Sequence, residues 1–163
     1  MLRFTSYDIV FQEIPDEVTL AINISNCPNR CKGCHSPWLM ENTGEVLNDG
    51  TLSEILAKYK GLVTCVCFMG GDTDPVEVDR LANLIRKKTN GKLKTAWYSG
   101  KKDFPEQCSL QNFDYIKLGP YIENLGGLSS PATNQRFYRI EENKPVDITC
   151  CFQKDRLRKI KTG

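Results

Sequence analysis

The sequence has no long hydrophobic run, and this absence excludes membrane-spanning proteins. No stretch reaches the roughly 18 or more apolar residues that a transmembrane helix requires. The first residues, Met1-Leu2-Arg3-Phe4-Thr5, also lack the long apolar core of a signal peptide. Net charge is nearly absent, since 22 Lys and Arg stand against 20 Asp and Glu, which does not favour a nucleic-acid-binding protein. We therefore expect a cytoplasmic protein that binds neither membrane nor nucleic acid.

Internal repeats, low-complexity tracts and linker-like shifts in composition are also absent. A chain of 163 residues is long enough to bury a core of its own. We therefore expect a single domain over residues 1–163, with a basic tail over residues 154–163. That tail holds five Lys and Arg against one Asp, and it is either a solvated face or a docking segment for an acidic partner surface.

Cysteine, in contrast, is plentiful, with eight thiols beside a single histidine. Thiols stay reduced in the cytoplasm, so eight of them indicate metal binding or redox chemistry before disulfides. A secreted disulfide-rich domain fits the count alone, but the N-terminal residues give no support for secretion.

Hydrophobic patterning predicts an α/β fold, because strand-like apolar runs alternate with amphipathic, helix-like segments. We expect strands at residues 3–14 (a strand or hairpin), 18–24, 62–69, 94–98, 115–118, 136–140 and 146–152, a loop at 44–50, and short helices within 36–40 and 105–112. A longer helix should begin at Thr51, which with Glu54 predicts a capping box, and end at Gly61. Another should begin at Asp74-Pro75, an N-cap followed by proline at the first helical position, and end at Asn90-Gly91.

Three cysteines lie close together directly after the strand expected at residues 18–24. Cys27, Cys31 and Cys34 have the spacing C-x3-C-x2-C, which gives one thiol fewer than the four ligands of a closed zinc site. A four-iron cluster can be held by three thiolates, which leaves one iron with an open position for a substrate. The spacing therefore favours an iron–sulfur cluster that takes part in chemistry.

A zinc site with His35 as the fourth ligand is the alternative interpretation. It requires the adjacent residues Cys34 and His35 to bind one tetrahedral ion together, which is awkward. His35 would otherwise line the site or cap the loop.

Polar and glycine-rich clusters follow each of the expected central strands. They are Gly70-Gly71-Asp72, Tyr98-Ser99-Gly100 and Gly119-Pro120-Tyr121, in addition to the cysteine loop. In parallel α/β sheets and barrels, ligands bind at the carboxyl ends of the strands. These clusters should therefore meet at one edge and form an active site.

Together these motifs resemble the radical S-adenosylmethionine (SAM) enzymes. The segments Cys31-Lys32-Gly33-Cys34-His35, Gly70-Gly71-Asp72, Tyr98-Ser99-Gly100, Lys117-Leu118-Gly119-Pro120-Tyr121 and Asn134-Gln135-Arg136 are similar to those of the activating proteins of anaerobic ribonucleoside-triphosphate reductases, relatives of the pyruvate formate-lyase activating enzyme. The resemblance covers a core of about residues 11–138. The chain departs from the wider pattern at Gly33, where many members have an aromatic residue, and at Asp72, where glutamate is commoner.

The resemblance implies a partial (β/α) barrel of mostly parallel strands, whose open side admits a macromolecular substrate. Cys27, Cys31 and Cys34 would bind a [4Fe-4S] cluster, and the fourth iron would take the amino and carboxylate groups of SAM. Gly70 and Gly71 would let the backbone approach the methionine end of SAM, and Asp72 would accept a hydrogen bond from its ammonium group.

It further implies that one electron cleaves SAM and that the resulting 5′-deoxyadenosyl radical takes a hydrogen from a glycine of the reductase large subunit. The electron would come from a flavodoxin- or ferredoxin-type donor. Tyr98 and Ser99 would contact SAM or pack at the strand end, and Lys117 would lie near the SAM carboxylate or extend to solvent. The segment Asn134-Gln135-Arg136 would meet the adenosine end or the partner, or serve as loop structure.

The remaining cysteines have a second interpretation. Cys65 and Cys67 point to one face of their strand and would form a metal pair with Cys150 and Cys151, or else be buried as small apolar side chains. Cys108 has no expected role.

Two other functions fit the same motifs. One is a radical SAM enzyme that acts on a small molecule, similar to a 7-deazapurine precursor synthase. The other is a non-catalytic zinc or iron–sulfur module that recruits a partner through the basic tail.

Overall fold

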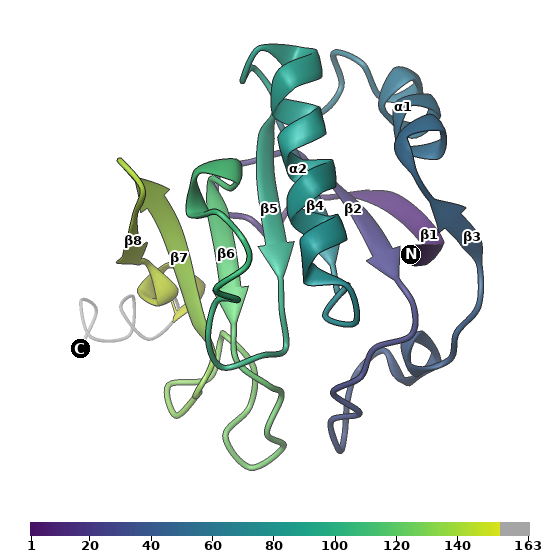
Figure 1. Ribbon diagram of the computed structural model, residues 1–163. Coiled ribbons are helices and arrows are strands. Elements are labelled where there is room, and N and C mark those ends of the chain that lie inside the picture. Colours follow the sequence, from purple (N-terminus) through teal and green to yellow (C-terminus); the bar gives the residue numbers. More distant parts are fainter. Residues whose placement is uncertain (154–163) are drawn as a thin grey trace.

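The computed structural model describes residues 1–153, so the predicted basic tail lies outside the described residues. These residues form one mixed eight-stranded sheet in the order β3-β1-β2-β4-β5-β6-β7-β8, with helices α1 and α2 (Figure 1). The strands are β1 (Leu2–Val10), β2 (Thr19–Ile24), β3 (Glu45–Leu47), β4 (Cys65–Met69), β5 (Lys94–Tyr98), β6 (Tyr115–Leu118), β7 (Arg136–Glu141) and β8 (Lys144–Asp147). The helices are α1 (Asp49–Lys58) and α2 (Pro75–Thr89). The expected α/β class is confirmed.

Parallel pairing is confined to the centre of the sheet. β2, β4, β5 and β6 pair in parallel, whereas β1 and β3 on one side and β7 and β8 on the other pair antiparallel. Figure 1 shows the arrows of β2, β5 and β6 pointing to the same lower edge, where the long loops gather. The carboxyl ends of the central strands therefore share one edge, as the sequence predicted.

The two faces of the sheet bury different clusters. Both helices contribute to the first cluster, in which Leu81 and Ile85 of α2 join Phe68, Trp97 and Ile116 of the strands, and Figure 1 shows α2 lying across β4 and β5. Strand side chains alternate between faces, so Cys67, Ala96 and Tyr115, which adjoin these strand residues, belong to the second cluster. Ile14, Cys65 and Phe137 are its other buried members. Among residues 1–153, no helix combines the length and apolarity needed to cross a membrane.

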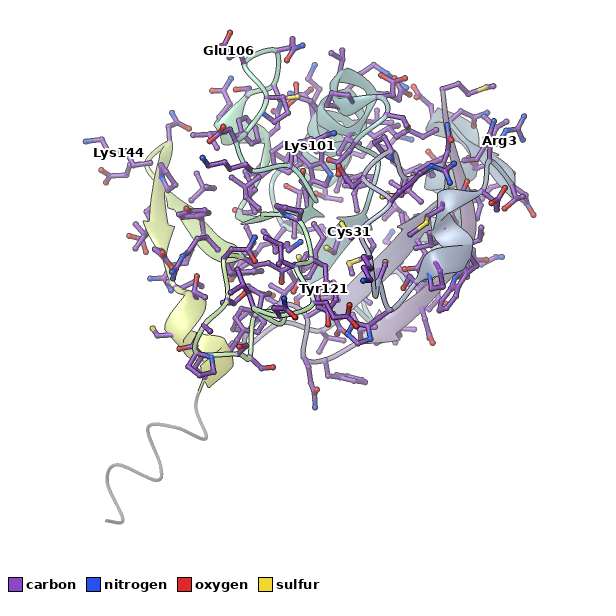
Figure 2. The ribbon with its side chains drawn as sticks, turned by 90° about the horizontal axis from the view of Figure 1, so that it is seen from below. Arg3, Cys31, Lys101, Glu106, Tyr121 and Lys144 are labelled. Carbon is purple, nitrogen blue, oxygen red and sulfur yellow. The ribbon has the colours of Figure 1, made fainter. Side chains whose placement is uncertain are left out.

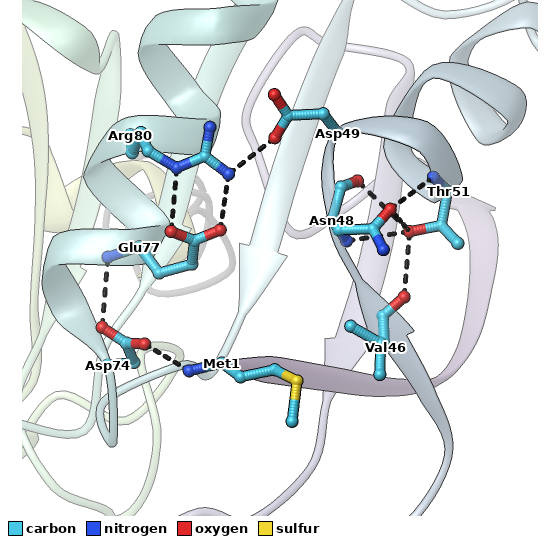
Figure 3. Close-up of polar contacts among 8 residues, drawn as sticks. All are labelled: Met1, Val46, Asn48, Asp49, Thr51, Asp74, Glu77 and Arg80. Carbon is cyan, nitrogen blue, oxygen red and sulfur yellow. Dashed lines mark hydrogen bonds and ion pairs between the residues drawn. The ribbon is translucent and has the colours of Figure 1, made fainter.

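Helix α2 begins and ends where its local sequence predicts. The Asp74 side chain caps it by accepting from the Glu77 amide, and Asn90 ends it in the left-handed conformation. Figure 3 shows the same Asp74 carboxylate in an ion pair with the Met1 amino group at 2.6 Å, and Arg80 bridging Glu77 of α2 to Asp49 of α1. Because these ion pairs are half-exposed, we assign them little stability.

Helix α1 begins two residues earlier than expected. Its capping box is formed by Asn48 and Thr51, not by Thr51 and Glu54: the Asn48 side chain accepts from the Thr51 amide, and the Thr51 hydroxyl accepts from the Asn48 amide (Figure 3). The loop expected at residues 44–50 is wrong in part, because β3 pairs there with β1.

Two other elements differ from the prediction. The strand expected at residues 146–152 is instead the end of β8 followed by a 3₁₀ helix, Thr149–Gln153. The turn forms because the Asp147 carboxylate accepts hydrogen bonds from both the amide and the hydroxyl of Thr149. Within 105–112, only a 3₁₀ turn forms, at Leu110–Asn112.

A buried carboxylate fastens the opposite edge of the sheet. Glu17 accepts hydrogen bonds from Lys94 at 2.5 Å, Thr64 at 2.5 Å and Tyr115 at 3.0 Å. Lys94 and Tyr115 are the first residues of β5 and β6, and Thr64 directly precedes β4. Burial alone would raise the pKa of Glu17, but these hydrogen bonds outweigh it and lower the pKa below 4.5.

Candidate functional site

A cavity of about 180 Å³ opens at the carboxyl edge of the parallel strands. Figure 2 looks onto this edge and shows Cys31 between Lys101 and Tyr121. Seven of the eight residues predicted from the sequence line the cavity: Cys27, Cys31, Cys34, Gly70, Asp72, Tyr98 and Ser99. Lys117 and Gln135 line it as well. The structure therefore brings together clusters that lie far apart in the sequence.

In the cysteine loop, the residue before each cysteine has a left-handed backbone conformation. Asn26, Arg30 and Gly33 each directly precede a cysteine, and each has a positive φ, of 59°, 45° and 76°. The left-handed conformation costs about 1–2 kcal/mol for most residues other than glycine, and less for asparagine, so Asn26 and Arg30 are strained, Arg30 more than Asn26. Gly33 adopts it without this cost, which gives a physical reason for glycine at this position.

The three thiols are half-buried and free. The Ser36 amide donates to Cys34 Sγ at 3.4 Å, and Asn29 Nδ2 lies 3.6 Å from Cys27 Sγ. Hydrogen bonds of this kind stabilise negative charge on sulfur and tune iron–sulfur clusters. Within residues 1–153, no three His, Cys, Asp or Glu side chains converge on a point where one metal ion would bind.

Asp72 is held by three hydrogen bonds from the protein. Its Oδ1 accepts from Ser99 Oγ at 2.6 Å, and its Oδ2 accepts from Asn29 Nδ2 at 2.7 Å and from the Gly100 amide at 2.8 Å. A carboxylate offers about four acceptor positions. One position therefore remains for a ligand donor, and the others connect the cysteine loop to the end of β5.

Gly70 and Gly71 occupy different environments. Gly70 lines the cavity with a φ of +105°, its amide donates to the Tyr98 carbonyl, and its carbonyl accepts from Trp97 Nε1 at 2.8 Å. Gly71 is buried beneath the rim, and a Cβ atom there would lie 2.6 Å from Cγ2 of Val78 in α2. Gly71 therefore has a packing role that the sequence did not reveal.

Tyr98 and Ser99 are both committed to protein partners. The Tyr98 hydroxyl donates to the Glu13 carbonyl, and burial raises the pKa of Tyr98 well above 10. Its ring contacts Phe137 edge-on and lines the cavity. Ser99 is fully buried, and its hydroxyl orients Asp72.

Lys117 places a buried ammonium group in the cavity wall. Nζ donates to the carbonyls of Ser99 at 3.1 Å and Gly119 at 2.8 Å. Burial lowers the pKa of Lys117 to about 8, although Asp72 and the three thiols oppose this shift. An ammonium group has three donors, so one remains for an anionic ligand.

The other candidate ligands lie apart from this arrangement. The exposed His35 ring packs against Tyr121, with ring centroids 5.2 Å apart. Cys65 and Cys67 are fully buried in the second core cluster, where burial raises the pKa of both thiols, whereas Cys150 is exposed. The contacts of Cys65 and Cys67 are those of small apolar side chains.

Asn29 is a site residue that sequence reasoning missed. Asn29 carried one signal, an amide side chain inside the cysteine spacing, but its partner lies 43 positions away. Gly100 was predicted as part of the cluster that follows the strand at residues 94–98, but the hydrogen bond from its amide to Asp72 was not. Comparison of the chain with protein-family models, curated proteins and solved structures gave no match.

Proposed function

We propose that the protein is a radical SAM activase that installs a glycyl radical on an anaerobic ribonucleoside-triphosphate reductase. One observation carries the proposal: a single loop brings three thiols to the same cavity as Lys117 and Asp72, at the carboxyl edge of four parallel strands. This combination of soft ligands, a buried cation and an anion suits a metal cluster beside a zwitterionic ligand.

The cysteine loop fits a [4Fe-4S] cluster. Each thiolate of such a cluster binds a different iron, so the ligands line a space and do not converge on one point. Cys27, Cys31 and Cys34 would hold three irons, with the amides of Asn29 and Ser36 directed at the sulfurs of Cys27 and Cys34. The fourth iron would remain open to SAM.

The cavity wall fits the amino-acid end of SAM. The third donor of Lys117 is available for its carboxylate, and the fourth acceptor position of Asp72 is available for its ammonium group. A bound and reduced cluster would supply the one electron needed to cleave the S–C5′ bond of SAM into methionine and the 5′-deoxyadenosyl radical. Lys117 and Asp72 would orient SAM for this cleavage.

The proposal extends to the fold and the partners. The parallel strands β2, β4, β5 and β6 and the connecting helices α1 and α2 would form the partial (β/α) barrel of the radical SAM type, open on one side for the glycine loop of the reductase large subunit. A flavodoxin- or ferredoxin-type protein would supply the electron, and the pair would work in the cytoplasm.

Anaerobic reconstitution tests the proposal. With iron and sulfide the protein should become brown, and on reduction it should cleave SAM to 5′-deoxyadenosine. Replacing Cys27, Cys31 or Cys34 with alanine should abolish cleavage, whereas Cys108→Ala, a control in a loop away from the cavity, should retain it.

Other outcomes would reject part or all of the proposal. A colourless protein that holds one zinc and is inert toward SAM would overturn it entirely. SAM cleavage without a glycyl radical signal on the reductase would retain the radical SAM chemistry but reject the activase, and would direct attention to a small-molecule substrate.

A further inference from the structure

We infer that Asn29 is a positioning residue of the cysteine loop, and that Asp72 serves as the anchor to which Asn29 fastens this loop. The inference rests on the proposed function only in that the fastened thiols hold a cluster. It assigns a role to a residue between two of the cysteines, and it changes the principal role expected of Asp72.

The contacts of Asn29 connect the two halves of the site. Nδ2 donates to Asp72 Oδ2 at 2.7 Å and lies 3.6 Å from Cys27 Sγ. Asp72 is in turn held by Ser99 and Gly100 at the end of β5. A continuous set of hydrogen bonds therefore runs from a cluster-ligating sulfur, through Asn29 and Asp72, to the rigid sheet.

The cysteine loop needs such a fastening because its backbone is strained. The left-handed residues Asn26 and Arg30 lie three positions before and one position after Asn29, and such strain persists only where the surroundings hold it. A hydrogen bond to a carboxylate is among the stronger single contacts that hold a loop. The Asn29–Asp72 bond lies between the two strained residues.

Gly100 provides independent support from packing. A Cβ atom at position 100 would lie 3.0 Å from Asn29 Cγ and closer still to Nδ2. The φ of Gly100 is not in the left-handed region, so backbone conformation gives no reason for glycine there. The close approach of Asn29 does.

The same contacts give a reason for aspartate at position 72. Glutamate is commoner at this position in the enzymes that the chain resembles, and it is one methylene longer. The shorter side chain places both carboxylate oxygens on the donors of Ser99, Gly100 and Asn29. Three of about four acceptor positions serve the protein itself.

Alkylation of cysteines in the protein without its cluster tests directly whether Asn29 holds the cysteine loop in place. In the reduced apoprotein, Asn29→Ala and Gly100→Ala should each speed the alkylation of Cys27 about tenfold. This is the lower end of the change expected when one hydrogen bond to a charged group is lost. Alkylation of Cys108 serves as the internal reference. Asn42→Ala, at an exposed asparagine, and Gly50→Ala, where a Cβ atom has only an ordinary contact at 3.4 Å, are matched controls and should react like the wild type.

The reconstituted protein gives two further readouts. Both variants should release iron to a ferrous chelator about tenfold faster than wild type. Their cluster should also have a more negative reduction potential, because an N–H donor to Cys27 sulfur is lost and such donors favour the reduced cluster. A purely structural defect would not shift the potential of the clusters that remain.

The outcomes separate this inference from the proposed function. Wild-type alkylation and iron-release rates in both variants would overturn the role of Asn29 while a brown wild-type protein still supports the cluster. If the wild type takes up no cluster, the proposed function fails, and the alkylation rates alone decide whether Asn29 fastens the loop.

Discussion

Substitution of Gly71 tests whether this glycine, next to the site, is needed for packing of the core or for binding of SAM. Its φ is +96°, and a Cβ atom there would lie 2.6 Å from Val78 Cγ2 and 3.4 Å from Ile24 Cδ1. Both neighbours are buried in the first core cluster. Gly71→Ala should therefore destabilise the apoprotein, in which no SAM is present.

The expected loss has two parts. A left-handed backbone costs about 1–2 kcal/mol for alanine, and overpacking of a well-packed core costs typically about 1–3 kcal/mol. The sum is about 2–5 kcal/mol, which at this chain length lowers Tm by between about 4 and 20 °C. Urea unfolding of the apoprotein, followed by circular dichroism, measures it.

A double-mutant cycle with Val78 identifies the contact. Val78→Ala alone should cost about 1.6 kcal/mol or more, for two buried methylene equivalents. In the double variant the methyl group introduced at position 71 occupies the space that Val78 vacates, so the loss should be smaller than the sum of the two single losses by about 1–3 kcal/mol. Gly50→Ala, on the first turn of α1, is the matched control and should not destabilise.

Two results would refute this reasoning. Strictly additive losses would mean that the Cβ atom introduced at position 71 does not meet Val78. Unchanged stability of Gly71→Ala, combined with weakened SAM binding, would mean that the glycine serves the approach of the backbone to SAM, as the resemblance implies.

Three polar side chains elsewhere give further predictions, each measured by urea unfolding of the apoprotein. Glu17→Gln should lose about 1–2 kcal/mol at pH 7, because half-exposed Lys94 loses its ion pair. Since the pKa of Glu17 is lowered in the fold, this advantage of the wild type is complete above pH 4.5 and shrinks as the pH falls below it. Asn48→Ala should lose about 1 kcal/mol with the N-cap of α1, whereas Asn42→Ala should lose nothing measurable. Burial lowers the pKa of Lys117 from 10.5 to about 8, so the wild type should gain stability relative to Lys117→Met as the pH rises between these values, and a constant difference would refute the shift.

Local sequence signals predicted the elements whose ends depend on adjacent residues. Helix α2 has its N-cap at Asp74 and its end at Asn90, as predicted, because each signal acts within one turn. Helix α1 was placed two residues late because Asn48 and Thr51 both suit an N-cap. The choice between them depends on β3, whose pairing with residues Leu2 to Phe4 of β1 is nonlocal.

The C-terminal part shows the same limit. Apolar residues from 146 to 152 have the pattern of a strand, but Asp147 binds the amide and hydroxyl of Thr149 and turns the chain. Such a turn competes with strand pairing through side-chain bonds that apolar patterning does not detect. The predicted basic tail beyond it lies outside the described residues.

In the candidate site, too, local sequence predicted one part, and contacts between distant residues decide the rest. Thiol spacing and strand order predicted which clusters would meet, because parallel strands carry their carboxyl ends to one edge. The roles within the cavity depend on contacts between distant residues: Asn29 with Asp72, and Gly71 with Val78. A motif thus identifies the residues that gather at the site, whereas their bonds decide which of them have donors or acceptors left for a ligand. By this criterion, the three cysteines have the greatest capacity to bind a ligand, whereas Lys117 and Asp72 each retain one position and Asp72 also holds the cysteine loop in place.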